Sequence, residues 1–294
     1  MRPARSILCG ADSHRGHVSI FHDTEERQLI VFTVLLRFIL TSALVVILSG
    51  PAFCAETFRV PILLYHRLGP TVADGMTIRT DVFESQMKYL HDNGYTVIPL
   101  RQLVDHYLGK VPAPKARSVV IVEDDAHASV YSDMLPIMRK YRYPVTIFTY
   151  PSAISNAKYA MTWAQLRELK ATGLFDIQSH TYWHPNFKKE RRKLTPDAFN
   201  KLVMTQLLKS KAKLESETGA KVDMLAWPFG IYDDNLIAKA TEAGHRATFT
   251  IERRHATSTD NVMKLPRYLL VNADSGKAFV QLLEGNAVKR NVAY

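Results

Sequence analysis

Side chains that could bind a metal ion or move a proton stand at the ends of apolar segments in this sequence. They are His66 in "LLYHRL", the acids Glu123–Asp125 in "VVIVEDDA", and His180 and His184 in "SHTYWHP". Two imidazoles and one carboxylate on one face bind a divalent ion and leave positions open for water. A second carboxylate beside them could accept a proton from that water. The residue types therefore predict a metal site with an adjacent base.

The spacing of these residues sets geometric expectations. His180 and His184 are four apart, which would put them on one face of a single helical turn that Pro185 must end. Asp124 and Asp125 cannot both point inward along a regular strand, although a strand end relaxes this constraint. Paired Asp residues are more often turn formers or helix caps. The metal site is favoured because both motifs occur together.

The elements that would position these motifs alternate between short apolar runs and segments of helical period, a pattern typical of parallel strands joined by helices. Expected strands are 59–65, 95–100, 118–122, 144–150, 175–179, 223–227, 246–250 and 264–271. Their number and the length of the region favour a distorted (β/α)7-type barrel in a single α/β domain over 56–294. In such a barrel the chemistry lies at the carboxyl ends of the strands, where the motifs fall.

Helix boundaries are marked by capping residues. The sequence predicts a helix over 81–93 with Thr80 as N-cap and Gly94 as its stop. A second is opened by Thr195 with Pro196 at its first position and closed by Gly219. A third covers 233–243.

The N-terminal region predicts export. Residues 29–55 contain a single charged residue, Arg37, and read as a secretory signal peptide or a membrane anchor. Residues 1–28 are an N-terminal extension, long for the region before a signal, which would fit a start assigned too early. We expect a protein of the periplasm or cell envelope, with inner-membrane association through residues 29–49 if the segment is retained.

Cysteine and charge content exclude several classes of site. Both cysteines, Cys9 and Cys54, precede the expected domain, so the domain has no disulfide or cysteine metal site. The net charge is +10, and basic clusters such as "KKERRK" at 188–193 have no interleaved aromatic residues. We interpret these clusters as solvated faces and expect no nucleic-acid partner.

The ordered motifs resemble those of the polysaccharide deacetylases, also called NodB-like carbohydrate esterases. The resemblance covers about 59–285: an Asp-Asp pair, then HxxxH between Ser and Pro, then "PFG". The "LLYH" near the start is similar to the branch that acts on exported poly-β-1,6-N-acetylglucosamine. This resemblance implies a barrel fold, an N-acetylated glycan polymer as partner, and a divalent ion, zinc first with cobalt or nickel as alternatives.

The resemblance also implies roles for individual residues. Asp124 would be the catalytic base and His66 the general acid, while Asp125, His180 and His184 would bind the metal. The residues expected to contact substrate are Trp227, Pro228, Phe229, Gly230 and Arg267. Trp227 and Trp163 are also candidates for ordinary packing.

Three positions depart from the family pattern. Glu123 replaces an aromatic residue and Ala126 a glycine, and Ala226 stands where an arginine is common. Arg267 could supply the missing positive group. If the replaced glycine has positive φ, alanine costs on the order of 1 kcal/mol there.

The leading hypothesis is therefore a metal-dependent N-deacetylase of an envelope polysaccharide. The alternative is a catalytically impaired relative that serves as a glycan-binding or assembly module. An iron oxygenase of the two-histidine, one-carboxylate type is disfavoured, because those enzymes use jelly-roll strands without intervening helices.

Overall fold

The computed structural model describes residues 28–29, 31–37 and 57–287. Residues 28–29 and 31–37 are helical. Within the described ranges, no helix combines the length and the apolar character needed to cross a membrane. The extension at 1–27 and most of the predicted signal or anchor segment, residues 38–55, lie outside the described residues.

The central sheet is built from parallel strands. Its spatial order is β10 (Ala247–Phe249), β9 (Met224–Ala226), β8 (Phe175–Ser179), β7 (Val145–Thr149), β6 (Ser118–Asp124), β2 (Ile62–Tyr65) and β12 (Tyr268–Leu269). β5 (Thr96–Val97) also pairs with β6. Two short pairs lie outside it: β1 (Arg59–Val60) with β11 (Ala256–Thr257), and β3 (Arg67–Gly69) with β4 (Thr77–Arg79).

The two edges of this sheet are joined by one C-terminal segment. Leu265 bridges Phe249 of β10 and donates its N–H to the carbonyl oxygen of Thr248 at 2.9 Å, while Tyr268 and Leu269 pair with β2. The segment between them therefore touches both edges, and the sheet curls into a barrel. The predicted single-domain α/β fold of distorted (β/α)7 type is confirmed.

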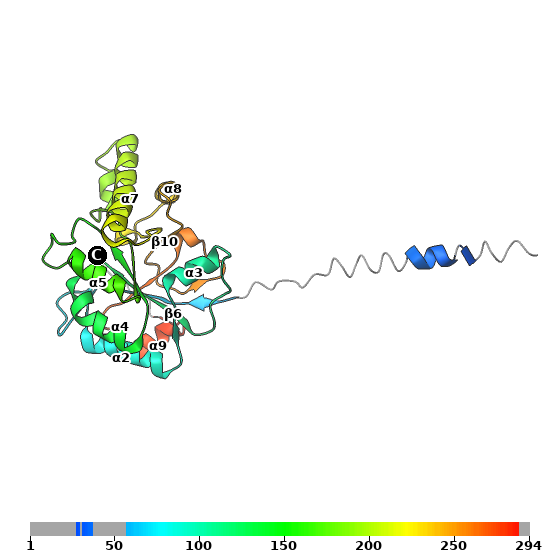
Figure 1. The fold of residues 1–294 in the computed structure, drawn as a ribbon, viewed down its shortest axis with the longest axis horizontal. Helices are drawn as coiled ribbons and strands as arrows, with labels where there is room; N and C mark the ends of the chain where they lie inside the picture. The colour runs from blue at the N-terminus through cyan, green and yellow to red at the C-terminus, as the bar shows by residue number, and fades with distance from the viewer. Residues whose placement is uncertain (1–27, 30, 38–56, 288–294) are drawn as a thin grey trace, which may run out of the picture. The chain divides into compact units, whose positions relative to one another are not determined.

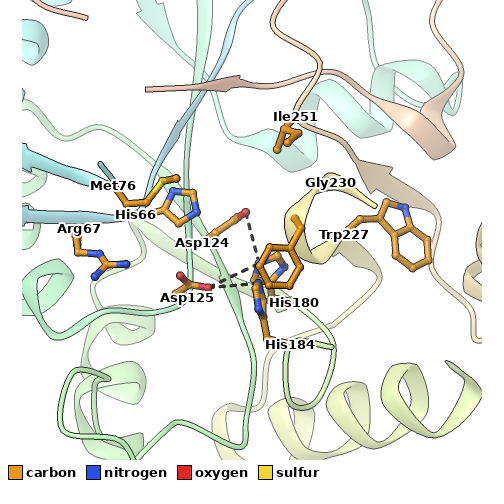
Figure 2. A pocket seen from close by; sticks show the side chains of 11 residues that line it. His66, Arg67, Met76, Asp124, Asp125, His180, His184, Trp227, Gly230 and Ile251 are labelled. Atoms are coloured by element: carbon orange, nitrogen blue, oxygen red, sulfur yellow. Dashed lines mark ion pairs between the residues drawn. The ribbon is translucent and has the colours of Figure 1, made fainter. Parts of the chain in front are cut away.

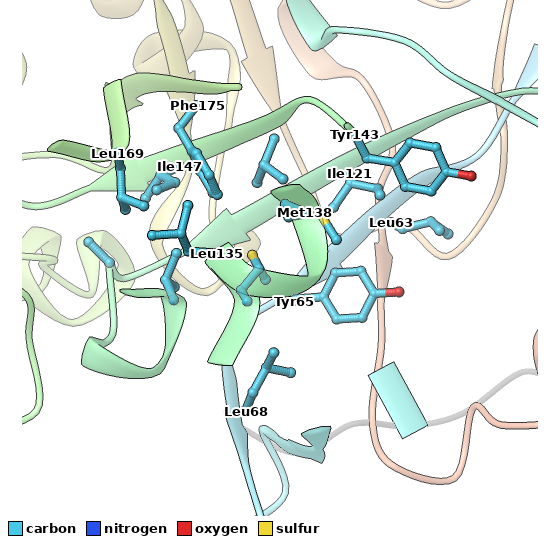
Figure 3. Packing of buried hydrophobic residues seen from close by; sticks show 14 of the residues in the cluster. Leu63, Tyr65, Leu68, Ile121, Leu135, Met138, Tyr143, Ile147, Leu169 and Phe175 are labelled. Atoms are coloured by element: carbon cyan, nitrogen blue, oxygen red, sulfur yellow. The ribbon is translucent and has the colours of Figure 1, made fainter. Parts of the chain in front are cut away.

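Side chains alternate between the two faces of the sheet. In β2, Ile62 and Leu64 belong to one buried cluster, and Leu63 and Tyr65 belong to another. The cluster that contains Leu63 and Tyr65, called the outer cluster below, fills the layer between the sheet and the helices. Figure 3 shows strand residues of this cluster packed on the helix that carries Leu135 and Met138. Both faces are thus apolar, which explains why the strands read as continuous hydrophobic runs.

The helices cover the outside of the barrel (Figure 1). They are α2 (Thr80–Asp92), α3 (Leu100–Tyr107), α4 (Leu135–Tyr141), α5 (Trp163–Ala171), α6 (Phe187–Arg191), α7 (Pro196–Thr218), α8 (Asp234–Glu242) and α9 (Lys277–Leu283). Shorter helical segments of the described chain are η1 (Val130–Met134), η2 (Pro228–Gly230) and η3 (Val262–Lys264). Figure 1 shows α2, α4 and α9 together, with α7 and α8 elsewhere on the surface.

Most helix boundaries agree with the capping signals. Thr195 caps α7 by accepting from the N–H of Ala198 at 3.3 Å, and Gly219 ends that helix with φ 62°. The prediction that Thr80 is an N-cap is wrong. Thr80 is the first helical residue, and its hydroxyl donates to Asp133 at 2.8 Å instead of accepting from its own backbone.

Several predicted strands are shorter than expected, and two of them change most. The run 95–100 forms a strand only at Thr96–Val97, because Leu100 already begins α3 after Pro99. The run 264–271 is divided between the bridge at Leu265 and the strand Tyr268–Leu269. Barrel closure causes this division, since the segment contacts β10 at Leu265 and pairs with β2 at Tyr268–Leu269.

His245 gives the fold a pH dependence that can be measured. Its ring is 2% exposed with no hydrogen-bond partner for either nitrogen among the described residues, and burial, aided by the charge of Lys211, lowers its pKa to about 4. The unfolded chain, with a His pKa of about 6.5, binds this proton more readily, so stability is lost as pH falls from 6.5 towards 4. Between pH 7 and pH 4.5, the unfolding free energy should fall by roughly 2 kcal/mol more in the wild type than in His245→Phe. Urea unfolding at both pH values measures this difference, and equal pH dependence in the two proteins would contradict it.

Candidate active site

The predicted chemical residues meet at one end of the barrel. β2 ends before His66, β6 ends at Asp124, and β8 ends before His180. They surround a cavity of about 210 Å³ (Figure 2), whose lining is His66, Arg67, Met76, Asp124, Asp125, His180, His184, Trp227, Phe229, Gly230 and Ile251. The carboxyl ends of parallel strands lie on the same edge of a sheet, which is why motifs far apart in the sequence converge here.

Asp125, His180 and His184 form a group that could hold a metal ion. Their nearest ligand atoms all lie within 4.8 Å of one another. Asp125 Oδ1 is 3.8 Å from His180 Nε2 and 3.9 Å from His184 Nε2. Ligand atoms about 2.1 Å from a tetrahedral ion lie about 3.4 Å apart, so small side-chain movements would bring these three to bonding positions.

A loop, not a helical turn, brings the two histidines together. The expected helical turn is wrong, because Thr181 and His184 have left-handed backbones with φ 64° and 58°. The side chain of Gln206 in α7 holds the loop by accepting the N–H groups of Tyr182 and Trp183 at 3.2 and 3.0 Å. The rings of His180 and His184 then lie 4.6 Å apart.

The donor atoms of this group fit a divalent cation. His180 Nδ1 lies 2.8 Å from the carbonyl oxygen of Ala226, an interaction that requires Nδ1–H and leaves Nε2 free to ligate. Burial lowers the pKa of His180 to about 4, and burial together with His180 lowers the pKa of His184 to about 3. Both imidazoles are therefore neutral near pH 7, as metal binding requires.

Asp125 has the environment of a carboxylate that lacks its counter-ion. Its Oδ1 is buried without a hydrogen-bond partner among the described residues. Burial, and then the charge of Asp124, raise the pKa of Asp125 to about 7. A cation between Asp125 and the two histidines would offset both effects.

Asp124 is kept charged by a buried arginine. Arg267 donates from Nη1 and Nη2 to the two oxygens of Asp124 at 2.7 and 2.9 Å, and neither side chain is more than 3% exposed. Burial alone would raise the pKa of Asp124, but Arg267, with a smaller effect from His180, brings it below its usual value. Asp124 is thus a carboxylate beside the metal group. Arg267 lies behind it and does not line the cavity, so its predicted contact with substrate stays a prediction.

Glu123 points away from the cavity. It pairs in register with Tyr65 and Ile147, whose side chains belong to the outer cluster, and it is 0% exposed. Burial, and then the charge of Asp125, raise the pKa of Glu123 well above its usual value. The carboxyl group of Glu123 therefore lies outside the cavity that Asp124 and Asp125 line.

The turn after β6 has an unusual backbone. Asp125 and Ala126 have φ values of 86° and 56°, both in the left-handed region. An L-residue pays on the order of 1–2 kcal/mol there, and Asp tolerates it better than Ala. Ala126 therefore bears the conformational free-energy cost that the sequence predicts, because its φ is positive, a value that glycine adopts freely.

His66 directly follows β2 and lines the same cavity as Asp125, His180 and His184. Burial lowers its pKa to about 4, although the charge of Asp124 acts in the opposite direction. Its Nδ1 has no hydrogen-bond partner among the described residues. His66 is therefore neutral at rest and can donate a proton only after it has received one.

The "PFG" segment forms one wall of the cavity. Phe229 and Gly230 line it, and the Phe229 ring lies 4.6 Å from the ring of His184. Gly230 has φ 64°, and a Cβ there would be 2.3 Å from Cγ1 of Ile251, so only glycine fits. Pro228 is buried and does not line the cavity.

Trp227 also borders the cavity but is held in the core. Its indole is fully buried and donates from Nε1 to the hydroxyl of Thr248 at 3.0 Å. Trp163, the other tryptophan considered for sugar contact, is absent from the cavity lining. Packing therefore accounts for both rings, and the predicted contact of Trp227 with substrate stays a prediction.

Three lining residues were not expected from the sequence: Arg67, Met76 and Ile251. Arg67 follows His66 directly and pairs with Asp74 at 2.8 Å. Ile251 follows closely after β10, so the rule that sites lie at strand ends could have found it. Met76 lies in a loop, and no pattern in the sequence marks it.

Comparison with known proteins finds a family that this sequence matches. The family described as polysaccharide deacetylase matches residues 112–248. A poly-β-1,6-N-acetyl-D-glucosamine N-deacetylase of Staphylococcus aureus is 27% identical over 206 residues, which cover 69% of each chain.

Solved structures share the fold. The Streptococcus pyogenes deacetylase PplD, in complex with acetate, superposes with a TM-score of 0.68 at 22% identity and covers 77% of this chain and 98% of its own. IcaB from Ammonifex degensii superposes with a TM-score of 0.67 at 22% identity, covering 78% of this chain and 97% of its own. Sequence and fold agree: residues 112–248 match the polysaccharide deacetylase family, and the chain shares the fold of solved deacetylases.

Proposed function

We propose that this protein is a metal-dependent N-deacetylase of an N-acetylglucosamine-containing polysaccharide in the cell envelope. The observation that carries the proposal is the group of Asp125, His180 and His184 in one cavity with the ionised Asp124. The S. aureus relative, named as a poly-β-1,6-N-acetyl-D-glucosamine N-deacetylase, supports the substrate class.

The residues divide the work of amide hydrolysis. A zinc, cobalt or nickel ion held by Asp125, His180 and His184 would make a water molecule more acidic and polarise the acetamide carbonyl. Asp124 takes a proton from the attacking water, and Arg267 keeps Asp124 ionised until then. The bond between the carbonyl carbon and nitrogen breaks, the nitrogen receives a proton, and acetate and a free amine result.

His66 is the proposed donor of that proton. Its position opposite the metal group suits the role, and the charge of Asp124 favours its protonated form. The role requires that His66 be protonated during turnover, because burial keeps it neutral at rest.

A glycan-binding module without turnover is the second candidate. The observation that favours it is the same neutral state of His66, together with an Nδ1 that has no partner among the described residues and leaves the tautomer unfixed. Acetate release from N-acetylglucosamine oligomers separates the candidates. Chelated protein should be inactive and regain activity with Zn²⁺, Co²⁺ or Ni²⁺, whereas metal binding without any acetate release would favour the module.

Export is the proposed localisation. The nearly uncharged segment 29–49 supports it, and retention of that segment would associate the protein with the inner membrane. Fractionation with N-terminal sequencing of the mature chain tests this. We expect the protein outside the cytoplasm, either membrane-bound or beginning after about residue 55. A soluble cytoplasmic protein with an intact N-terminus would contradict it.

Removal of a ligand should remove the metal. Asp125→Asn and His184→Ala should lower zinc content after dialysis from about one equivalent to nearly none, because two remaining side chains hold an ion poorly. His127→Gln is the matched control, since His127 is outside the ligand group and should leave zinc content unchanged. Full zinc retention by Asp125→Asn would show that the ion lies elsewhere.

The proposed acid, His66, and the proposed base, Asp124, can be distinguished by comparing substrates with different leaving groups. His66→Gln should lower kcat for acetamide hydrolysis by roughly 10²–10⁴-fold and spare an activated aryl acetate, whose leaving group needs no proton. Asp124→Asn should lower kcat for both substrates, because water must be deprotonated in each case. Metal content serves as the control for both variants. Equal losses on both substrates for His66→Gln would argue against its role as the acid.

A further inference from the structure

The turn that presents Asp125 has an unusual anchor. Asp125 and Ala126 are consecutive left-handed residues without being glycine. This turn begins where β6 ends, at Asp124, and directs Asp125 into the cavity. Something must stabilise a backbone shape that Ala126 alone disfavours.

Glu123 makes the contacts that can do so. Its Oε2 accepts the N–H of Ala126 and its Oε1 accepts the N–H of His127, each at 3.2 Å. In the described structure neither N–H has a backbone acceptor. One buried carboxyl group thus satisfies two successive donors on the side of the turn opposite the cavity.

Other roles for Glu123 fit the structure less well. It is not in the metal group, and its side chain lies on the outer face of the sheet, with Ile121 and Ile147. It contacts neither the cavity nor a surface. Within the described part of the chain, the hydrogen bonds of its side chain are those to the turn.

We propose that Glu123 is a positioning residue for the metal ligand Asp125, and that Glu123 and Ala126 form a compensating pair. The two hydrogen bonds that Glu123 accepts from Ala126 and His127 hold the left-handed turn that Ala126 would otherwise weaken. The glycine that the resembling motif has at this position needs no such support, because it adopts positive φ freely. The departures at 123 and 126 then act together to keep Asp125 in place.

A double-mutant cycle on the full-length protein tests the coupling. Glu123→Leu removes both acceptors, Glu123→Gln keeps one, and Ala126→Gly removes the backbone penalty. Zinc affinity, measured by competition with a chromophoric chelator, should weaken roughly 10–100-fold in Glu123→Leu and less in Glu123→Gln. Adding Ala126→Gly to Glu123→Leu should recover most of this loss.

Gln86→Leu is the control for general destabilisation. Gln86 is buried on the same outer face and accepts from the hydroxyl of Tyr65 at 3.0 Å, but it does not contact the turn. This variant should lower the melting temperature and leave zinc affinity unchanged. The visible absorption of the Co²⁺ form adds a direct report of ligand geometry, which should change in Glu123→Leu and not in Gln86→Leu.

Two results would overturn the proposal. One is zinc affinity in Glu123→Leu equal to the wild type, whatever its melting temperature. The other is a loss from Glu123→Leu that is the same with and without Ala126→Gly, which would show that the two positions are independent. If Glu123→Leu does not fold, the same comparison is made with Glu123→Gln in both backgrounds.

The proposal rests on the proposed metal role of Asp125, and the two can fail separately. If Asp125→Asn keeps its zinc, the proposed function is wrong and Glu123 has no ligand to position. If Asp125→Asn loses zinc while Glu123→Leu keeps wild-type affinity, only the positioning role is wrong.

Discussion

One buried ion pair ties the barrel and its chemistry together. The guanidinium of Arg267 is fully buried, binds both oxygens of Asp124, and donates from Nε to the carbonyl oxygen of Thr250 at 2.9 Å. It therefore connects the end of β6 to the chain just beyond β10, from within the segment that closes the sheet. Removing one partner of such a pair costs about 3–5 kcal/mol, because the other charge stays buried. Barrel closure and the buried charge of Asp124 depend on the same side chain.

Three adjacent acids have three different states because the strand end separates them. Glu123 lies on the outer face and burial raises its pKa, Asp124 lies inside and Arg267 lowers its pKa, and Asp125 lies past the strand with a pKa raised to about 7. Three charged carboxylates close together in the same surroundings would repel one another. Strand alternation places Glu123 and Asp124 on opposite faces of the sheet, and the left-handed turn then directs Asp125 into the cavity, so each acid has its own surroundings.

Much of this arrangement could be predicted from sequence. Continuous apolar runs alternating with capped helices indicate a parallel barrel, and the strand-end rule brings His66, Asp124 and His180 together. The loop shape around His184 could not be predicted, because two left-handed residues and the side chain of Gln206 from a distant helix determine it. The sequence suggested Arg267 as a source of positive charge but not its pairing with Asp124, because the two residues lie 143 positions apart in the chain. The outward direction of Glu123 follows from strand alternation once the end of β6 is known.

The closing segment also sets the order in which the molecule can be completed. Leu265 and Tyr268 join the two edges of the sheet, and both lie near the end of the chain that the structure describes. During synthesis, Asp124 emerges long before its arginine partner. Until that segment is in place, the two edges of the sheet are not joined and Asp124 lacks its buried partner Arg267. The surroundings of Asp124 in the cavity thus depend on a segment near the carboxyl end of the described chain.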